Sequence, residues 1–250
     1  AKKLQRQNNL NVEFENVMVT NGAKQAIYNL FQILLNDGDE VIIPAPYWLS
    51  YPQIVRLAGG KPVFIKSSAE DGFKINMKDL KSKISSKTKF IIINTPNNPT
   101  GRVMSKEELL QIANVARDNK NINILSDEIY ELILKKEFKH FSLSTLATDL
   151  KERIFIINGF AKGWAMTGWR VGYLVGSKDV IKASSALQSQ STSNVCSFVQ
   201  KGALEALNIN QEFFLKINNH YDQRRTLLYE GLKNINGIYI QEPNGAFYAF

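Results

Sequence analysis

Six short apolar runs alternate with segments of helical periodicity along the chain, and this alternation constrains the fold more than any other feature. The runs are rich in β-branched and aromatic residues and cover residues 40–43, 62–65, 90–93, 122–125, 154–157 and 171–175. Strands that are apolar throughout are typical of a sheet with both faces covered. Helical periodicity fills gaps between them, for example over residues 23–35, 106–118 and 179–190. The pattern predicts an α/β fold with a mainly parallel central sheet and helices on both faces.

The pattern changes near residue 195, where long helices replace the alternation. Helices are predicted over residues 195–207 and 212–232, followed by a short strand over residues 238–240. The chain ends in an apolar run, residues 245–250, that resembles a strand cut in the middle. We expect a large domain over residues 1–205, with a connecting helix and the truncated start of a smaller α+β domain in residues 206–250. The polar opening and the apolar ending indicate a fragment of a longer polypeptide.

Charge and composition narrow the classes of partner. The chain has 31 Lys and Arg against 23 Asp and Glu, a net charge of +8. Its densest lysine stretch, residues 78–89, lacks the interleaved aromatic residues that stack on bases, so we expect a solvated face and no nucleic-acid partner. No apolar run approaches the roughly 18 residues that span a bilayer, so we expect no membrane association. A single cysteine and two histidines predict neither an internal disulfide nor a clustered Cys/His metal site, which fits a reducing cytoplasm.

Unusual residues gather after the predicted strands, at the edge where open α/β sheets bind ligands. Lys162 lies among small residues in a segment with almost no other charge. Loss of hydration lowers the pKa of such a lysine and leaves a neutral amine for Schiff-base chemistry. Asp127 ends a buried strand, where an ionised carboxylate needs a cationic partner such as a protonated pyridine nitrogen. A helix N-cap is the alternative role for Asp127. Tyr130 would face the same side if this turn is helical.

A second candidate site lies at the start of the helix predicted over residues 23–35. Free backbone amides and the helix dipole make this start suitable for a phosphate group, and the absence of a side chain on Gly22 allows close approach. An ordinary helix start is the alternative interpretation. The segment Asn21 to Lys24 is therefore a candidate phosphate cradle only in combination with other features.

These features together resemble the fold-type I pyridoxal-phosphate aminotransferases. The resemblance is to the class I branch that includes bacterial aspartate and aspartate/prephenate aminotransferases, and it covers essentially the whole chain. It rests on five motifs in the family's order: residues 21–26 (NGAKQA), 44–48 (PAPYW), 97–101 (NNPTG), 126–130 (SDEIY), and Lys162 with Arg170 eight residues later. The resemblance implies pyridoxal 5'-phosphate as cofactor, bound by the large domain over residues 1–205, and a homodimer with active sites at the subunit interface.

The resemblance also implies a role for individual residues around the cofactor ring. Lys162 would form the Schiff base with the cofactor aldehyde and then move the proton between the substrate α-carbon and the cofactor. Asp127 would pair with the pyridinium nitrogen. Asn98 and Tyr130 would hydrogen-bond the ring's phenolic oxygen, and Trp48 would stack on the ring face. The peptide bonds before Pro46 and Pro99 match positions where relatives carry cis bonds, and at least the Asn98-Pro99 bond is expected to be cis.

The cofactor phosphate would take Arg170, in a charge-assisted contact, together with backbone amides around Gly22 and Ala23. The chain departs from many relatives here, because Gly159 and Ala161 stand where those relatives have a hydroxyl residue. We therefore expect Arg170 and the helix amides to contribute more to phosphate binding than they do in those relatives. A further contribution is expected from Ser or Thr of residues 190–194, which form either a cofactor-site loop or a subunit-interface loop.

Three residues are expected to contact substrate: Lys24, Trp48 and Asn98. By the resemblance, Lys24 would contact the distal carboxylate of a dicarboxylic amino acid and would lie close to the cofactor phosphate. The alternative is a surface lysine beside the phosphate with no substrate contact. In the family, an arginine of the small domain holds the substrate α-carboxylate and an N-terminal segment closes over the site. The present sequence contains neither, so an isolated chain is expected to transaminate poorly.

The implied activity is transamination between aspartate or glutamate and a 2-oxo acid, with use of prephenate or arogenate left open. A different fold-type I enzyme, a C–S lyase or a synthase, is an alternative, because these enzymes share the lysine, the aspartate and the arginine. A non-catalytic effector-binding domain of a transcription factor is a second alternative.

Overall fold

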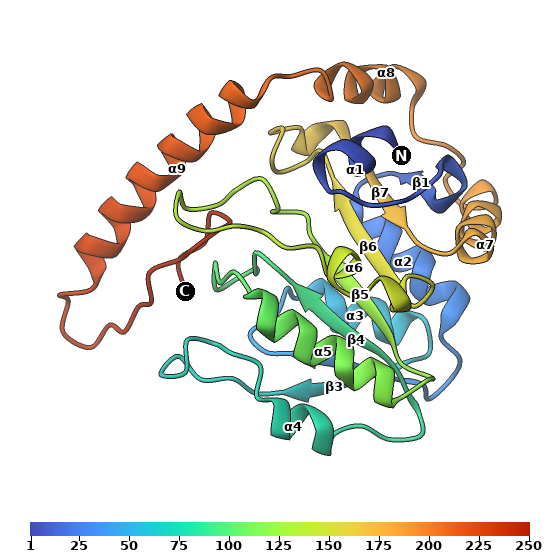
Figure 1. Ribbon diagram of the computed structural model, residues 1–250, viewed down its shortest axis with the longest axis horizontal. Coiled ribbons are helices and arrows are strands. Elements are labelled where there is room, and N and C mark those ends of the chain that lie inside the picture. Colours follow the sequence, from blue (N-terminus) through green and yellow to red (C-terminus); the bar gives the residue numbers. More distant parts are fainter.

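The computed structural model describes residues 1–250 and is built around one seven-stranded sheet (Figure 1). The strands lie in the order β1-β7-β6-β5-β4-β2-β3. All six predicted strands are present, and the predicted fold class is confirmed. The bounds are β1 (Val17–Thr20), β2 (Glu40–Pro44), β3 (Lys61–Ile65), β4 (Thr88–Asn94), β5 (Asn123–Asp127), β6 (Ile154–Gly159) and β7 (Gly172–Val175).

The sheet is mainly parallel, with one reversed strand. Strands β3, β2, β4, β5 and β6 pair in parallel, whereas β7 runs antiparallel to both β6 and β1. Parallel neighbours need a crossover connection, usually a helix, while the chain between β6 and β7 contains only turns and a short 3₁₀ segment, Thr167–Trp169. Strand β1, a four-residue edge strand with three apolar residues followed by Thr20, was not predicted from the sequence.

Helices cover both faces of the sheet, as the apolar strands predicted. Side chains from successive strand positions enter different cores: Ile91 and Ile93 join the larger apolar cluster, while Phe90 and Ile92 join the second. Figure 1 shows these helices around the sheet. Their bounds are α1 (Lys2–Gln7), α2 (Ala23–Leu34), α3 (Ser50–Leu57), α4 (Met77–Ser82), α5 (Lys106–Asp118), α6 (Leu143–Leu146), α7 (Lys178–Ser189), α8 (Ser197–Ala206) and α9 (Gln211–Leu232).

Local sequence explains the best-predicted helix, α5, which has the bounds that the periodicity predicted. Ser105 accepts a hydrogen bond from the Glu108 backbone amide, and the Glu108 side chain accepts one from the Ser105 amide. This reciprocal capping box fixes the start of the helix. Leu109, Ile112 and other apolar residues at helical spacing are fully buried against the sheet.

The prediction of a strand over residues 238–240 is wrong. This segment has no regular secondary structure, and the side chains of Ile238 and Tyr239 are 43% and 63% exposed, so no apolar face is buried as a sheet would require. The terminal apolar run is not a strand either, since only an isolated bridge joins Gly245 to Leu134. It returns toward the sheet after α9, which extends away from it in Figure 1. No helix combines the length and hydropathy that a membrane span requires.

Candidate active site

A cavity of about 230 Å³ lies at the carboxyl ends of β4, β5 and β6, where the parallel sheet predicted a ligand site. Eight of the nine predicted site residues line it, from six separate stretches of the sequence. These are Ala23, Lys24, Trp48, Asn98, Asp127, Tyr130, Lys162 and Arg170. The ninth, Gly22, is buried next to Ala23 and contacts the Arg170 side chain closely.

Asp127 is the last residue of β5 and is buried at the cavity wall, 4% exposed. Its carboxylate accepts hydrogen bonds from the Tyr51 hydroxyl, at 2.6 Å, and from the Ile129 backbone amide, at 3.2 Å. Burial raises the pKa of Asp127 to about 6, against the opposing effects of these two hydrogen bonds and of the Lys162 charge. Its carboxylate therefore has hydrogen-bond donors but no cation in direct contact, and it favours a cationic ligand.

Lys162 follows β6 and lines the cavity beside two aromatic rings. Its Nζ lies 5.7 Å from the centre of the Tyr130 ring and 5.2 Å from the centre of the Phe247 ring. Burial lowers the pKa of Lys162, the Arg170 charge lowers it further, and Asp127 partly opposes both. A lysine with this environment is more easily deprotonated, so its amine is available as a nucleophile or a base.

Tyr130 lies in the turn after β5 and shares the cavity wall with Asn98, which the family resemblance assigns to the same oxygen of the cofactor ring. The Asn98 side chain lies beside the Tyr130 hydroxyl and lowers the pKa of Tyr130 against the larger effect of burial. Asn98 is itself held by its backbone amide, which donates to Asn94 Oδ1 at 2.7 Å, and the Asn98-Pro99 peptide bond is cis, as predicted. The bonds before Pro46 and Pro96 are also cis. Burial raises the pKa of Tyr130, so its hydroxyl is a neutral donor at physiological pH.

The start of α2 and Arg170 form one wall of the cavity. Gly22 is the N-cap of α2 with φ 84°, and no side chain caps the first amides of the helix. The positive φ favours glycine, and a Cβ on Gly22 would displace the Arg170 guanidinium from its present position. Free amides at a helix start and a guanidinium beside them form a cradle suited to a phosphate.

The segment between Lys162 and Arg170 adds a cavity residue that was not singled out from the sequence. Thr167 lines the cavity, and its carbonyl accepts a hydrogen bond from Arg170 Nη1 at 2.9 Å. The segment 190–194 does not line the cavity. Instead, Thr192 Oγ1 accepts hydrogen bonds from Asn21 and Gln25, behind the start of α2.

Lys24 and Trp48 lie together at the rim. Lys24 is exposed, and its Nζ lies 5.0 Å from the centre of the Trp48 ring. Trp48 packs edge-on against Tyr51, with ring centres 5.3 Å apart and ring planes at 90°. An exposed ammonium held at the mouth of a cavity can reach the distal end of an anionic ligand.

Sequence reasoning missed several residues of the cavity, chiefly Tyr51, Asn94, Thr167 and Tyr248. Asn94 directly follows a predicted strand and Thr167 lies between Lys162 and Arg170, so both had a positional signal. Tyr51 lies three residues after Trp48, in the first turn of α3, and its backbone amide donates a hydrogen bond to the Trp48 carbonyl at 3.1 Å. Tyr248 had no local signal, because the chain must return from α9 before its hydroxyl reaches the Tyr130 hydroxyl at 2.5 Å.

The residues around the cavity fit pyridoxal phosphate. The group needs an amine for its aldehyde, a carboxylate for its ring nitrogen and cationic and amide donors for its phosphate. Lys162, Asp127 and the cradle of Arg170 and Gly22 supply these three in one cavity. The buried carboxylate without a cation in direct contact and the glycine-dependent cradle are the two observations that support the fit most directly.

Comparisons with known proteins agree with this geometry. The family model described as aminotransferase class I and II matches residues 1–250. A probable aspartate/prephenate aminotransferase of Rickettsia felis is 47% identical over 248 residues, 99% of this chain and 61% of the relative. The aspartate aminotransferase of Bacillus subtilis is 45% identical over 250 residues, 100% of this chain and 63% of the relative. The chain therefore spans about three fifths of the length of these relatives.

Solved structures give the same result. An aspartate aminotransferase double mutant of Thermus thermophilus superposes with a TM-score of 0.94 at 43% identity, covering 100% of this chain and 64% of that one. The aspartate aminotransferase of Rhizobium meliloti superposes with a TM-score of 0.96 at 38% identity, covering 99% of this chain and 62% of that one.

Proposed function

Because the chain belongs to the aminotransferase class I and II family, we propose that it transfers amino groups between an amino acid and a 2-oxo acid with pyridoxal 5'-phosphate as cofactor. The observation that carries the proposal is the meeting of the Lys162 amine, the Asp127 carboxylate and the Arg170 guanidinium in one cavity. The names of the relatives favour aspartate or glutamate as the amino donor. Prephenate is a candidate acceptor through the name of the Rickettsia relative.

When bound, pyridoxal phosphate supplies an aldehyde that reacts with amines and a protonated ring that withdraws electrons from the substrate α-carbon. Lys162 would hold the aldehyde end and, as a base with a lowered pKa, take and return the proton at the substrate α-carbon. Asp127 would hold the ring nitrogen with its carboxylate, which the Tyr51 hydroxyl keeps oriented. The ring nitrogen would supply the cation that the buried Asp127 carboxylate favours.

The other residues orient the ring and the substrate. Tyr130 and Asn98 would donate to the ring's phenolic oxygen, since their side chains already meet at that wall. Trp48 would pack on the ring face. Arg170 and the amides at Gly22 and Ala23 would hold the phosphate.

Lys24 supports the choice of a dicarboxylic substrate. Its ammonium lies at the cavity rim over Trp48, away from the buried Asp127 end of the site. A distal carboxylate of aspartate or glutamate would reach this rim, whereas a neutral side chain gains nothing there. Trp48 and Asn98 would line the substrate's path.

We further propose a cytoplasmic homodimer in which residues 1–205 bind the cofactor and residues 206–250 begin a smaller domain. Two exposed apolar residues beside the cavity support association. Leu49, directly after Trp48, is 79% exposed, and Trp169, directly before Arg170, is 46% exposed. The single cysteine fits a reducing compartment.

Reconstitution with the cofactor tests the function. The purified chain is loaded with pyridoxal phosphate and glutamate is added alone; transamination converts the bound cofactor from its aldehyde to its amine form and releases 2-oxoglutarate, both measurable by absorbance and product assay. A lyase of the same fold would release product and keep the aldehyde form. A non-catalytic binding domain would bind without release of product. Cofactor binding without conversion by any amino acid would contradict the proposal.

A further inference from the structure

Lys3, in the short helix α1, is buried between the two loops that carry the proposed cofactor ligands. Only 7% of its side chain is exposed, and its ammonium forms an ion pair with Glu131, whose side chain is 5% exposed. It also donates hydrogen bonds to Asn8 Oδ1, at 2.8 Å, and to the Tyr173 hydroxyl, at 3.2 Å. Sequence reasoning assigned no role to any of these residues.

Two residues that Lys3 contacts lie next to proposed cofactor ligands in the chain. Glu131 follows Tyr130 directly, on the loop after β5. Trp164 lies two residues after Lys162, on the loop after β6, and its ring centre is 5.7 Å from Lys3 Nζ. One ammonium therefore contacts the loop of Asp127 and Tyr130 as well as the loop of Lys162.

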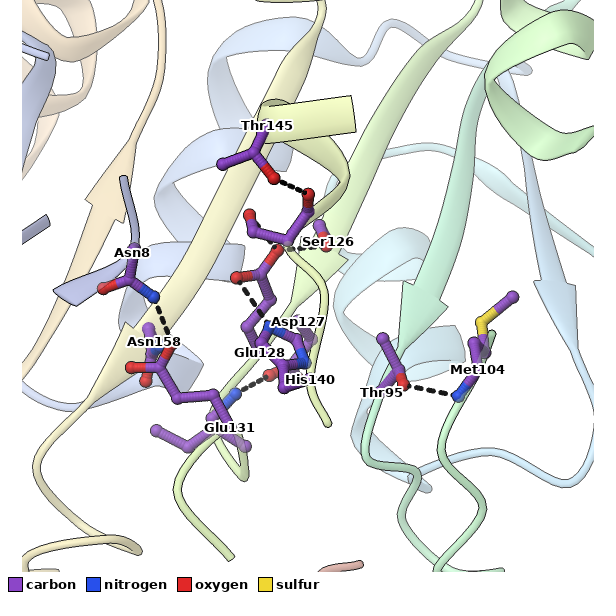
Figure 2. Close-up of polar contacts among 12 residues, drawn as sticks. Asn8, Thr95, Met104, Ser126, Asp127, Glu128, Glu131, His140, Thr145 and Asn158 are labelled. Carbon is purple, nitrogen blue, oxygen red and sulfur yellow. Dashed lines mark hydrogen bonds and ion pairs between the residues drawn. The ribbon is translucent and has the colours of Figure 1, made fainter. Parts of the chain in front are cut away.

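Lys3 forms a buried ion pair with Glu131, which lies on the loop after β5. Burial favours the neutral forms of both groups. Tyr173 and Glu131 nevertheless raise the pKa of Lys3, and Lys3 lowers the pKa of Glu131. Asn8 donates a second hydrogen bond to the Glu131 carboxylate at 2.5 Å, which Figure 2 shows. A buried pair of this kind is costly to break from one side, because the remaining charge stays buried without a partner.

A second internal cluster fixes the residue next to Asp127. The Glu128 carboxylate accepts hydrogen bonds from Ser126, at 2.8 Å, and Ser142, at 2.9 Å, and lies 3.2 Å from His140 Nε2 (Figure 2). Glu128, Glu131 and His140 lie close enough together to bind a metal ion. Lys3 already neutralises Glu131, however, and the Glu128 hydrogen bond raises the pKa of His140 against the effect of burial. These groups therefore form internal ion pairs that hold the loop.

We propose that Lys3 is a positioning residue for the cofactor site, whose contacts with Glu131 and Trp164 set the separation between the loop of Asp127 and Tyr130 and the loop of Lys162. The inference rests on the proposed function, since the two loops matter through the cofactor that they would hold together. It gives the N-terminal helix a part in the chemistry although none of its residues lines the cavity.

Three variants test the role. Lys3→Met keeps the length and removes the charge, and Lys3→Met/Glu131→Gln removes both charges so that no unpaired carboxylate remains. Leu4→Ala is the matched control, because Leu4 is a buried neighbour on the same helix and its truncation leaves the ion pair intact. For each chain, the dissociation constant of pyridoxal phosphate, the visible circular dichroism of the bound cofactor and the urea midpoint of the cofactor-free chain are measured.

A positioning role predicts that Lys3→Met and the double variant bind the cofactor about tenfold more weakly and change its circular dichroism. Leu4→Ala should lower the urea midpoint while the dissociation constant stays within about twofold. If Lys3→Met does not fold, the double variant decides. Wild-type affinity and spectrum in the double variant, or equal weakening by Leu4→Ala, would overturn the inference. Failure of the wild-type chain to bind pyridoxal phosphate would instead refute the proposed function, and this inference with it.

Discussion

Replacing Asp127 by asparagine should stabilise the cofactor-free protein at neutral pH, although the same change should weaken cofactor binding. The carboxylate is almost fully surrounded by protein, and burial raises its pKa from the ordinary 3.8 to about 6. Without a bound cation, its ionisation therefore opposes folding. An asparagine at this position would carry no charge and would avoid this cost.

The magnitude follows from the pKa. A rise from 3.8 to about 6 corresponds to about 3 kcal/mol at pH 8, where the group is ionised in both folded and unfolded chains. Asparagine has one acceptor oxygen, so it can keep the Tyr51 hydrogen bond or the Ile129 hydrogen bond but not both, and the loss costs about 1 kcal/mol. The expected net gain in the free energy of unfolding is about 2 kcal/mol at pH 8.

The pH dependence gives the sign of the effect. Because the pKa of the acid is higher in the folded chain, the cost of ionisation is complete above about pH 6 and absent well below 3.8. The advantage of Asp127→Asn should therefore disappear as the pH falls from 8 to 4, where the remaining cost of ionisation, about 0.5 kcal/mol, is smaller than the cost of the lost hydrogen bond. Urea unfolding of the two cofactor-free chains at both pH values measures it. A difference that does not change with pH, or a less stable variant at pH 8, would refute the reasoning.

Three further changes test the site. Tyr51→Phe removes the hydroxyl that lowers the pKa of Asp127, so the pH below which cofactor affinity falls should rise by roughly one unit; an unchanged profile would contradict the assignment. Lys24→Ala should weaken aspartate and glutamate at least about tenfold more than a neutral amino acid in steady-state kinetics, and equal losses would reject a contact with the distal carboxylate. Lys162→Ala should slow conversion of the cofactor to its amine form by roughly 10⁴-fold in single-turnover absorbance, and a loss below tenfold would exclude Lys162 as the base.

Local patterns in the sequence predicted the parts of the fold that depend on local physics. The α5 helix carries its own capping box and apolar face, and its bounds followed from residues 105–118 alone. Six strands were predictable to within two residues at each end, because most of each run is apolar. Since all parallel strands end at the same edge, Asn98, Asp127 and Lys162 could be expected in one place before the structure was known.

Contacts made by the return of the chain could not be predicted in this way. Tyr248 meets Tyr130 only because residues 245–246 pair with Leu134 and Ile133 after the long excursion through α9. Lys3 and Glu131 form an ion pair although they are 128 residues apart in the sequence. A lysine near the start of a polar segment looks like any surface lysine, and nothing nearby indicates that its ammonium is buried.

Two lysine and carboxylate pairs of this protein, Lys3 with Glu131 and Lys162 with Asp127, differ in the direction of their pKa shifts, and the difference separates a structural role from a chemical one. Lys3 and Glu131 are in contact, so each favours the charged form of the other: the pKa of Lys3 rises and that of Glu131 falls. Lys162 and Asp127 interact across the cavity without a direct hydrogen bond, so burial dominates both: the pKa of Lys162 falls and that of Asp127 rises. The first pair is already satisfied and holds the loops. The second pair is satisfied only when a ligand brings an electrophile to Lys162 and a cation to Asp127, which is the requirement that pyridoxal phosphate meets.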